Sequence, residues 1–225
     1  MSPRLIVNAS RARRIDLIAV TDHNSAAMTT AVAEAAAEAG LAFLYGMELQ
    51  TREEVHLLAY FDDCEACAAL SRAVYELLPD RPNEPAYFGD QVCVDIDETI
   101  LRSEPKLLVN SLDLGFDEAV RLVRSHGGLP VPAHVDRETY GLIAQLGFVP
   151  EGLVFDLVEV VSGVLPDGFG SAVAVCSSDA HDPSQIGRRT TVFEMNDCTV
   201  DEMVRAARGV GGRSVACCPG EWRMK

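Results

Sequence analysis

Short apolar runs alternate with amphipathic stretches along most of the chain. The apolar runs have the length of buried strands, and the amphipathic stretches repeat their apolar positions at helical spacing. One amphipathic stretch, Ala26–Ala39, ends at Gly40, as a helix stopped by a C′ glycine should. Such an alternation predicts parallel strands joined by right-handed crossover helices. The predicted strands are residues 15–20, 41–49, 55–61, 129–133, 154–161, 172–177 and 190–195, and the predicted helices are residues 5–14, 26–39, 64–78, 116–125, 138–146 and 200–208.

The stretch from Pro79 to Leu114 interrupts this alternation. It contains four prolines, and its two apolar segments, residues 91–96 and 107–110, are typical of an inserted hairpin. A lid beside a functional site and an ordinary surface excursion are both compatible with this pattern. No internal repeat or linker divides the chain, so we expect one domain over residues 1–225 with an excursion at about 79–114.

Length and composition favour a folded protein without a membrane span. A chain of 225 residues, 48% of them apolar, can bury a large core in one domain. The longest apolar stretches are strand-sized and interrupted by charges, and the N-terminus lacks the apolar region of a secretory signal. We therefore expect a cytoplasmic protein whose seven scattered cysteines are free. The Cys64–Cys67 pair lies in a predicted helix, where a metal or redox role is disfavoured.

The formal net charge of −15 narrows the partners that the sequence predicts. Phosphate backbones demand clustered lysines and arginines, so we expect a small phosphate ester as the partner and no long nucleic acid. The chain contains no Gly-rich phosphate loop, and Ser177 and Ser178 lack the glycines of a nucleophile elbow. These absences leave metal-assisted chemistry as the leading hypothesis.

Metal-binding side chains follow several of the predicted strands. The chain holds five histidines, four of which occur in motifs of this kind, and a glutamate occurs in another. Because the carboxyl ends of parallel strands meet at one edge of an α/β fold, these side chains are predicted to gather there. Histidine and carboxylate together suit zinc, manganese or iron. The motifs are Thr21-Asp22-His23, Gly46-Met47-Glu48, Val55-His56, Ala133-His134 and Ser178-Asp179-Ala180-His181.

Three arginines near these motifs are candidates for substrate binding. Arg137 follows His134, and Arg188 and Arg189 follow the Asp179/His181 motif. Guanidinium groups make bidentate contacts to phosphate, although surface salt bridges are their ordinary use in an acidic protein. The fifth histidine, His126, precedes Gly127-Gly128, where a helix-terminal role is favoured.

These motifs, in this order and spacing, resemble the polymerase-and-histidinol-phosphatase (PHP) family, in particular its metal-dependent phosphoesterases. The similarity extends from about residue 3 to residue 208. It is carried by the segments Leu17-Ile-Ala-Val-Thr-Asp-His-Asn24, Thr51-Arg-Glu-Glu-Val-His-Leu-Leu58, Pro132-Ala-His-Val-Asp-Arg137 and Ser177-Ser-Asp-Ala-His181. The resemblance implies a distorted (β/α)7 TIM-like barrel with up to three divalent ions at its carboxyl end.

The resemblance also implies a role for each candidate residue. Glu48 would bridge two ions, Asp179 would bind the first, and His56 and His134 would complete the second. His23 and His181 would bind the third. Asp22 would orient a neighbour of the ions and, with His23, is the candidate for a direct part in catalysis.

The chain departs from the family pattern at its beginning. The family opens with a strand that carries His-x-His and then a further ligand, whereas this chain begins at Met1-Ser2-Pro3-Arg4. The resemblance therefore implies a barrel without its first strand and an unpaired parallel edge. Truncation and a real loss of the strand both explain this; we favour truncation, because six ligand positions remain.

The sequence predicts a metal-dependent phosphoesterase that hydrolyses a small phosphorylated molecule or short nucleotide by metal-activated water. Manganese, zinc and iron all suit the ligand set. Two other functions remain open: an inactive or regulatory PHP-like module that binds metal, and a nucleic-acid exonuclease.

Overall fold

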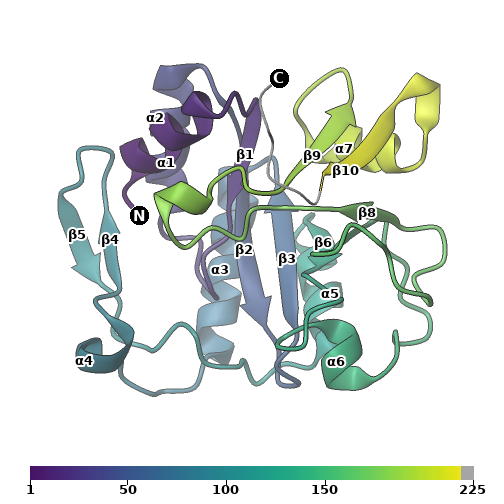
Figure 1. The fold of residues 1–225 in the computed structure, drawn as a ribbon. Helices are drawn as coiled ribbons and strands as arrows, with labels where there is room; N and C mark the ends of the chain where they lie inside the picture. Colours follow the sequence, from purple (N-terminus) through teal and green to yellow (C-terminus); the bar gives the residue numbers. More distant parts are fainter. Residues whose placement is uncertain (219–225) are drawn as a thin grey trace.

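The computed structural model describes residues 1–218 (Figure 1). A four-stranded sheet in the order β1-β2-β3-β6 occupies the centre, and three two-stranded sheets pair β4 with β5, β7 with β8, and β9 with β10. The strands are β1 (Leu17–Val20), β2 (Ala42–Gln50), β3 (His56–Phe61), β4 (Val92–Val94), β5 (Ile100–Ser103), β6 (Leu129–Pro132), β7 (Leu157–Glu159), β8 (Val173–Val175), β9 (Thr190–Glu194) and β10 (Ser214–Cys218).

The helices confirm most of the expected elements. As the sequence predicts, helix α2 is terminated by Gly40, whose φ of 65° is left-handed. The helices are α1 (Pro3–Ala12), α2 (Thr29–Ala39), α3 (Cys64–Leu77), α4 (Pro85–Phe88), α5 (Phe116–Ser125), α6 (Leu142–Leu146) and α7 (Val200–Ala207), with short 3-10 turns η1 (Pro183–Gln185) and η2 (Val210–Gly212). Within residues 1–218, no helix combines the length and the apolar character that crossing a membrane requires.

The expectation of uniformly parallel strands is wrong at β3. The pairs β1–β2 and β7–β8 are parallel, but β3 runs antiparallel to both β2 and β6. The reason is the connection from Gln50 to His56, which is far shorter than the dozen or more residues of a parallel crossover. It closes as a turn, in which the Thr51 amide donates to the Val55 carbonyl (2.9 Å).

The two faces of β2 and β3 have different surroundings. Leu49 and Leu57 pair across the strands and pack into a core that includes Leu70 of α3 and Val120 of α5. Because side chains alternate between the faces of a strand, Glu48 and Leu58 point to the other face. There Leu58 packs with Leu44, Val131, Leu157 and Met203.

Residues 1–218 do not form a closed barrel. The structure confirms a mixed α/β fold but not the expected closure of its strands into a barrel. Within this part of the chain, β1 is an edge strand that pairs with β2 alone. All four of its residues are half-buried. A cavity of about 1360 Å³ extends along it, and residues of β1, β8 and β9 line this cavity together with Glu48 and Asp179.

The excursion between α3 and α5 contains α4 and the β4–β5 hairpin, which projects from one side of the molecule (Figure 1). Its second strand is residues 100–103 rather than the expected 107–110. The reason is a tight turn in which Asp95 Oδ1 accepts the amides of Asp97 (3.0 Å) and Thr99 (2.9 Å). The end of the excursion is held by the buried Asn24, whose Nδ2 donates to the carbonyls of Leu108 and Asn110.

The expectation that every cysteine is free is wrong for one pair. Cys176, which follows β8, and Cys217, in β10, form a disulfide with a Cα–Cα distance of 5.4 Å. Their sequence separation of 41 residues gave no indication of this contact. The remaining cysteines, Cys64, Cys67, Cys93, Cys198 and Cys218, are free.

The register of β3 places Leu57 in the core beside His56, and this generates a stability prediction. Leu57 is fully buried, so we expect Leu57→Ala to lower the free energy of unfolding by about 2–5 kcal/mol through lost burial and a residual cavity. Leu101→Ala, at a side chain that is 65% exposed, should change it by less than about 0.5 kcal/mol. Urea denaturation followed by circular dichroism measures both; equal effects would contradict the described core.

Candidate metal centre

Four predicted ligand residues converge on the face of the sheet opposite Leu57. Glu48 and His56 share this face because Glu48 pairs with Leu58 and His56 pairs with Gln50. His134 follows the end of β6, which runs beside β3, and His23 forms a parallel bridge with Glu48. His56 is the first residue of β3, whereas the other ligand candidates lie at or after the ends of strands. It reaches the same site because β3 is antiparallel to β2 and β6, so β3 starts where those strands end.

Glu48, His56 and His134 present three ligand atoms at metal-binding separations. His56 Nδ1 lies 3.2 Å from Glu48 Oε1 and 3.2 Å from His134 Nε2, and His134 Nε2 lies 3.6 Å from Glu48 Oε1. Atoms bound tetrahedrally at ~2.0–2.2 Å from a zinc ion would lie about 3.3–3.6 Å from one another. One divalent ion therefore fits between these three atoms with little movement of the side chains.

The surroundings of His56 fix its orientation. Its Nε2 lies 3.2 Å from Gln50 Oε1, so a proton on Nε2 can be donated to that oxygen. In this tautomer the lone pair of Nδ1 faces Glu48 and His134. The Tyr140 ring stacks on the imidazole at a centroid distance of 4.5 Å, and the His56 amide donates to the Tyr140 carbonyl.

His23 lies on the other oxygen of Glu48, at 3.2 Å from Nδ1 to Oε2. Although this atom is buried and close to the carboxylate, its geometry is not that of a hydrogen bond. The ligand atoms of His23, Glu48 and His56 lie within 4.8 Å of one another.

Burial and charge set the protonation of this cluster. Burial alone would raise the pKa of Glu48. Without an ion, the facing nitrogens of His134 and His56 can carry protons and donate to the carboxylate, and these hydrogen bonds outweigh burial and hold that pKa well below its usual range. Burial lowers the pKa of His23. The cluster therefore combines an ionised carboxylate with a neutral His23 imidazole, which is the state that binds a divalent cation.

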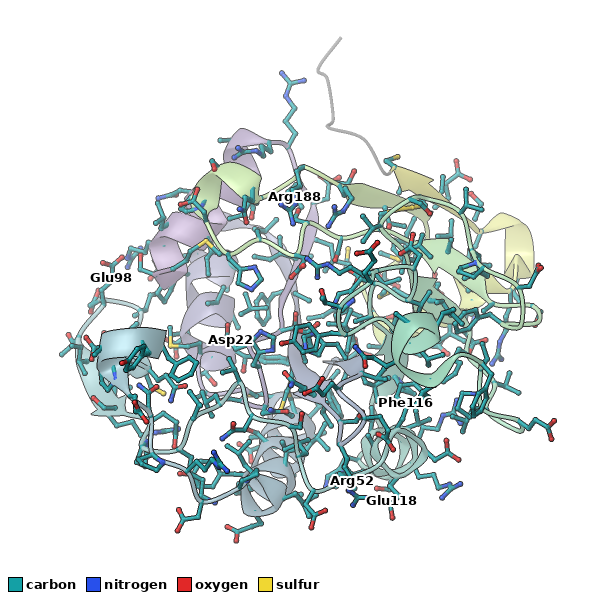
Figure 2. The ribbon with its side chains drawn as sticks, turned by 60° about the horizontal axis from the view of Figure 1, so that its bottom comes forward. Asp22, Arg52, Glu98, Phe116, Glu118 and Arg188 are labelled. Atoms are coloured by element: carbon teal, nitrogen blue, oxygen red, sulfur yellow. A yellow bond between two sulfur atoms is a disulfide. The ribbon has the colours of Figure 1, made fainter. Side chains whose placement is uncertain are left out.

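Asp22 and the Asp179/His181 motif lie beside the cluster without joining it. Asp22 lies near the centre of Figure 2. Asp179 has a φ of 46°, and its Oδ2 accepts a hydrogen bond of 2.9 Å from Arg137 Nη1. The His181 side chain is 68% exposed, and its ring centroid lies 6.4 Å from that of His23. The assignments of these three residues to catalysis and metal binding stay predictions.

The three candidate substrate-binding arginines surround the Asp179 loop. Arg188 Nε donates to the Ser178 carbonyl (2.6 Å), and Arg189 Nε donates to the Ser177 carbonyl (3.0 Å). Figure 2 labels Arg188 on the segment that follows β8. Arg137 pairs with Asp179, and a cation on Asp179 would compete with this contact.

Glu159, at the end of β7, is a buried carboxylate that belongs to none of the sequence motifs. Its Oε2 accepts the His134 amide (2.9 Å), and its Oε1 accepts the Ser177 hydroxyl. Burial raises the pKa of Glu159, while the hydrogen bond from Ser177 opposes the rise. Glu159 thus connects the backbone of His134 to the strand end that precedes Asp179. A single charge inside the apolar run Leu157–Val161 was the signal that could have revealed it.

Two kinds of similarity to known proteins match this site. A family model described as PHP-associated matches residues 173–209, which include β8, the Asp179 loop, Arg188 and Arg189. No curated protein sequence matches the chain. The predicted resemblance to the PHP family is confirmed by this segment and by the structural neighbours.

The structural neighbours are PHP-like phosphoesterases and an endonuclease. The lesion-specific endonuclease EndoQ from Pyrococcus furiosus matches with a TM-score of 0.70 at 18% identity, over 96% of this chain and 53% of that chain. A putative metal-dependent phosphoesterase from Bifidobacterium adolescentis matches at 0.54 and 19% identity, over 91% and 89% of the two chains. A two-domain protein from Bacteroides vulgatus, with a predicted PHP-like phosphoesterase, matches at 0.51 and 14% identity, over 96% and 60%. The chain spans about half the length of the EndoQ chains.

The expectation of a small-molecule partner and no long nucleic acid is wrong. An Endonuclease Q structure with a TM-score of 0.68, at 17% identity, contains a 27-mer duplex with an abasic lesion at its active site; it matches 95% of this chain and 53% of that chain. The exclusion rested on net charge, which sums the whole surface, whereas phosphate binding depends on the local field near the site. An acidic chain with this fold therefore keeps nucleic acid among its possible substrates.

The Glu48 cluster generates a metal-binding prediction. We expect the chain to bind at least one divalent ion, and Glu48→Gln to bind it at least ten-fold more weakly, because the buried negative charge is lost. Elemental mass spectrometry of dialysed protein measures the stoichiometry. Glu54→Gln, at an exposed carboxylate on the neighbouring turn, is the matched control. Equal metal content in the two variants would contradict the site.

The contacts of Glu159 generate a second prediction. Glu159→Gln removes the charge that receives the His134 amide and the Ser177 hydroxyl, so we expect metal affinity to fall about 10–100-fold while the fold persists. Chelator competition measures the affinity, and circular dichroism checks the fold. Glu151→Gln, at an exposed position, should leave the affinity unchanged. An unaltered affinity in Glu159→Gln would show that these bonds do not position His134.

Proposed function

We propose that this chain is a metal-dependent phosphoesterase that hydrolyses phosphodiesters in nucleic acid. The spacing of Glu48, His56 and His134, with ligand atoms 3.2–3.6 Å apart, is the observation that carries the metal dependence. The structural similarity to an endonuclease bound to duplex DNA supports the substrate class. Asp179, His181 and His23 would hold further ions, up to three in all, of manganese, zinc or iron.

A bound divalent ion would supply a water of lowered pKa and neutralise phosphoryl oxygens. The chain's own residues would prepare the site for this chemistry. Gln50 and Tyr140 fix the His56 ring, and Glu159 holds the His134 backbone. The guanidinium groups of Arg188 and Arg189 would bind non-bridging phosphate oxygens of the substrate beside the reacting phosphate.

Asp22 has a distinct part in this proposal. Its side chain is exposed and lines the cavity that also contains His23 and His181. It would orient a neighbouring His23 or His181 imidazole or hold a proton beside the reacting phosphate. The barrel-like arrangement of the strands would set all these groups at one end of the sheet, as in other α/β barrels.

Hydrolysis of labelled oligonucleotides tests the proposal. The chain, loaded with Mn²⁺, should cleave single-stranded DNA, duplex DNA or duplex DNA with an abasic site, and EDTA should abolish the cleavage. We expect Glu48→Gln to lower kcat/KM at least 100-fold, whereas Glu54→Gln should stay within two-fold of the parent chain. Gel electrophoresis resolves the products and separates internal cleavage from exonuclease action.

A negative outcome is also informative. A folded, metal-loaded chain that cleaves none of these substrates, nor bis(p-nitrophenyl) phosphate, would contradict the proposed hydrolysis. It would favour a non-catalytic module that binds metal.

A further inference from the structure

Four arginines line the cavity that leads to the metal centre: Arg13 and Arg14 at the end of α1, and Arg188 and Arg189 after η1. Within residues 1–218, none of them has a carboxylate oxygen within 4.0 Å, the limit for an ion pair. Eight arginines elsewhere on the chain make ion pairs: Arg4, Arg52, Arg102, Arg121, Arg137, Arg205, Arg208 and Arg213. Within residues 1–218, Arg11, Arg72, Arg81 and Arg124 also make none, but they lie outside the cavity and are not grouped there. In a chain with a net charge of −15, unpaired cations gathered on one cavity need a separate explanation.

The two pairs of arginines are connected through the segment that follows the Asp179 loop. Arg13 Nη2 donates to the Ser184 carbonyl (2.9 Å), and the Arg13 side chain crosses over Gly187. A Cβ at Gly187 would lie 2.7 Å from Arg13 Cδ, and Gly187 has a φ of 79°, so this crossing requires glycine. The end of α1 is therefore packed against the residues that precede Arg188.

Arg188 and Arg189 keep free donors after their contacts with the protein. Arg188 donates to the carbonyls of Ser178 and Asp179, and Arg189 donates to the carbonyl of Ser177. A guanidinium group has five N–H donors, so several remain on each side chain. Burial lowers the pKa of Arg189, and the adjacent charge of Arg188 lowers it further, while the carboxylates of Glu159 and Asp179 oppose this change. The free donors of the two adjacent guanidinium groups favour the binding of an anion.

We propose that Arg13, Arg14, Arg188 and Arg189, here called the arginine tract, bind consecutive backbone phosphates of a nucleic-acid strand whose reacting phosphate lies at the metal centre. This inference rests on the proposed function and adds the path of the substrate. Four aspartates also line the cavity and oppose the binding of a phosphate backbone: Asp16, Asp22, Asp179 and Asp197. Divalent ions at the metal centre would offset the carboxylates nearest to it, and salt screens the acidic surface beyond ~8–10 Å, which leaves the arginine tract to contact the strand.

Arg14 and Arg11 provide a matched pair of variants. Both are exposed residues at the end of α1, but only Arg14 lines the cavity. The probes are fluorescein-labelled, phosphorothioate-linked oligodeoxynucleotides, single-stranded and duplex, which resist hydrolysis by the metal-loaded chain. Fluorescence anisotropy measures binding from 50 to 200 mM KCl.

We expect Arg14→Gln to weaken binding several-fold and to reduce the slope of log K against log salt by about 0.7–0.9, the value for one lost phosphate contact. The double variant Arg13→Gln/Arg14→Gln should reduce this slope by about twice as much. The double variant Arg13→Lys/Arg14→Lys retains both charges and should have the slope of the parent chain. Arg11→Gln should bind as the parent chain does.

The outcomes separate the tract from the catalytic proposal. Identical affinity and slope for Arg14→Gln and Arg11→Gln would overturn the arginine tract, even if the chain cleaves DNA. No detectable binding by the parent chain would overturn it as well. Tract-dependent binding without cleavage would support the arginine tract while contradicting the proposed hydrolysis.

Discussion

The buried carboxylate of Glu48 is the constraint on which this site depends. Its side chain is 10% exposed and lies between three imidazoles. An ionised carboxylate taken out of water costs several kcal/mol unless it is paired or hydrogen-bonded, or binds a cation. Protonated histidines would compensate it, and so would a divalent ion held by neutral ones. The near-tetrahedral separations of Glu48, His56 and His134 favour the ion, because three ligand atoms already surround one position.

The antiparallel course of β3 makes this arrangement possible. A parallel β3 would have placed His56 at the opposite end of the sheet from Glu48. The short turn after Gln50 brings the chain back at once, so Gln50 and His56 pair directly and Glu48 lies on the same face. Asn24 then accepts the Gln50 amide at 3.0 Å and anchors the end of the excursion, while Glu159 holds His134. Residues of β2, β3 and β7, with residues that follow β1 and β6, thus support one small cluster.

The distribution of charge matters more here than its sum. The acidic residues give the chain a net charge of −15, yet unpaired arginines lie along the cavity that opens beside β1. In the proposed complex, a surface of this kind would repel polyanions in general and still admit a phosphate backbone along one path. Net charge and local field therefore support different conclusions about nucleic acid, and the local field is the one that acts at binding distance.

Periodicity and motif order determined much of this protein from the sequence alone. All of the helices except α4, which lies in the excursion, overlap an expected range, and the ligand candidates Glu48, His23, His56 and His134 converge as expected. These features are local, since strand ends and helix stops are set by neighbouring residues. The direction of β3 could also have been predicted, because the connection after Gln50 is too short for a parallel crossover. Only the tertiary structure decided the Cys176–Cys217 contact, the bonds of Glu159 and the gathering of Arg13 with Arg188. Each of these depends on which distant segments pack together, and side-chain type and spacing along the chain carry little information about that.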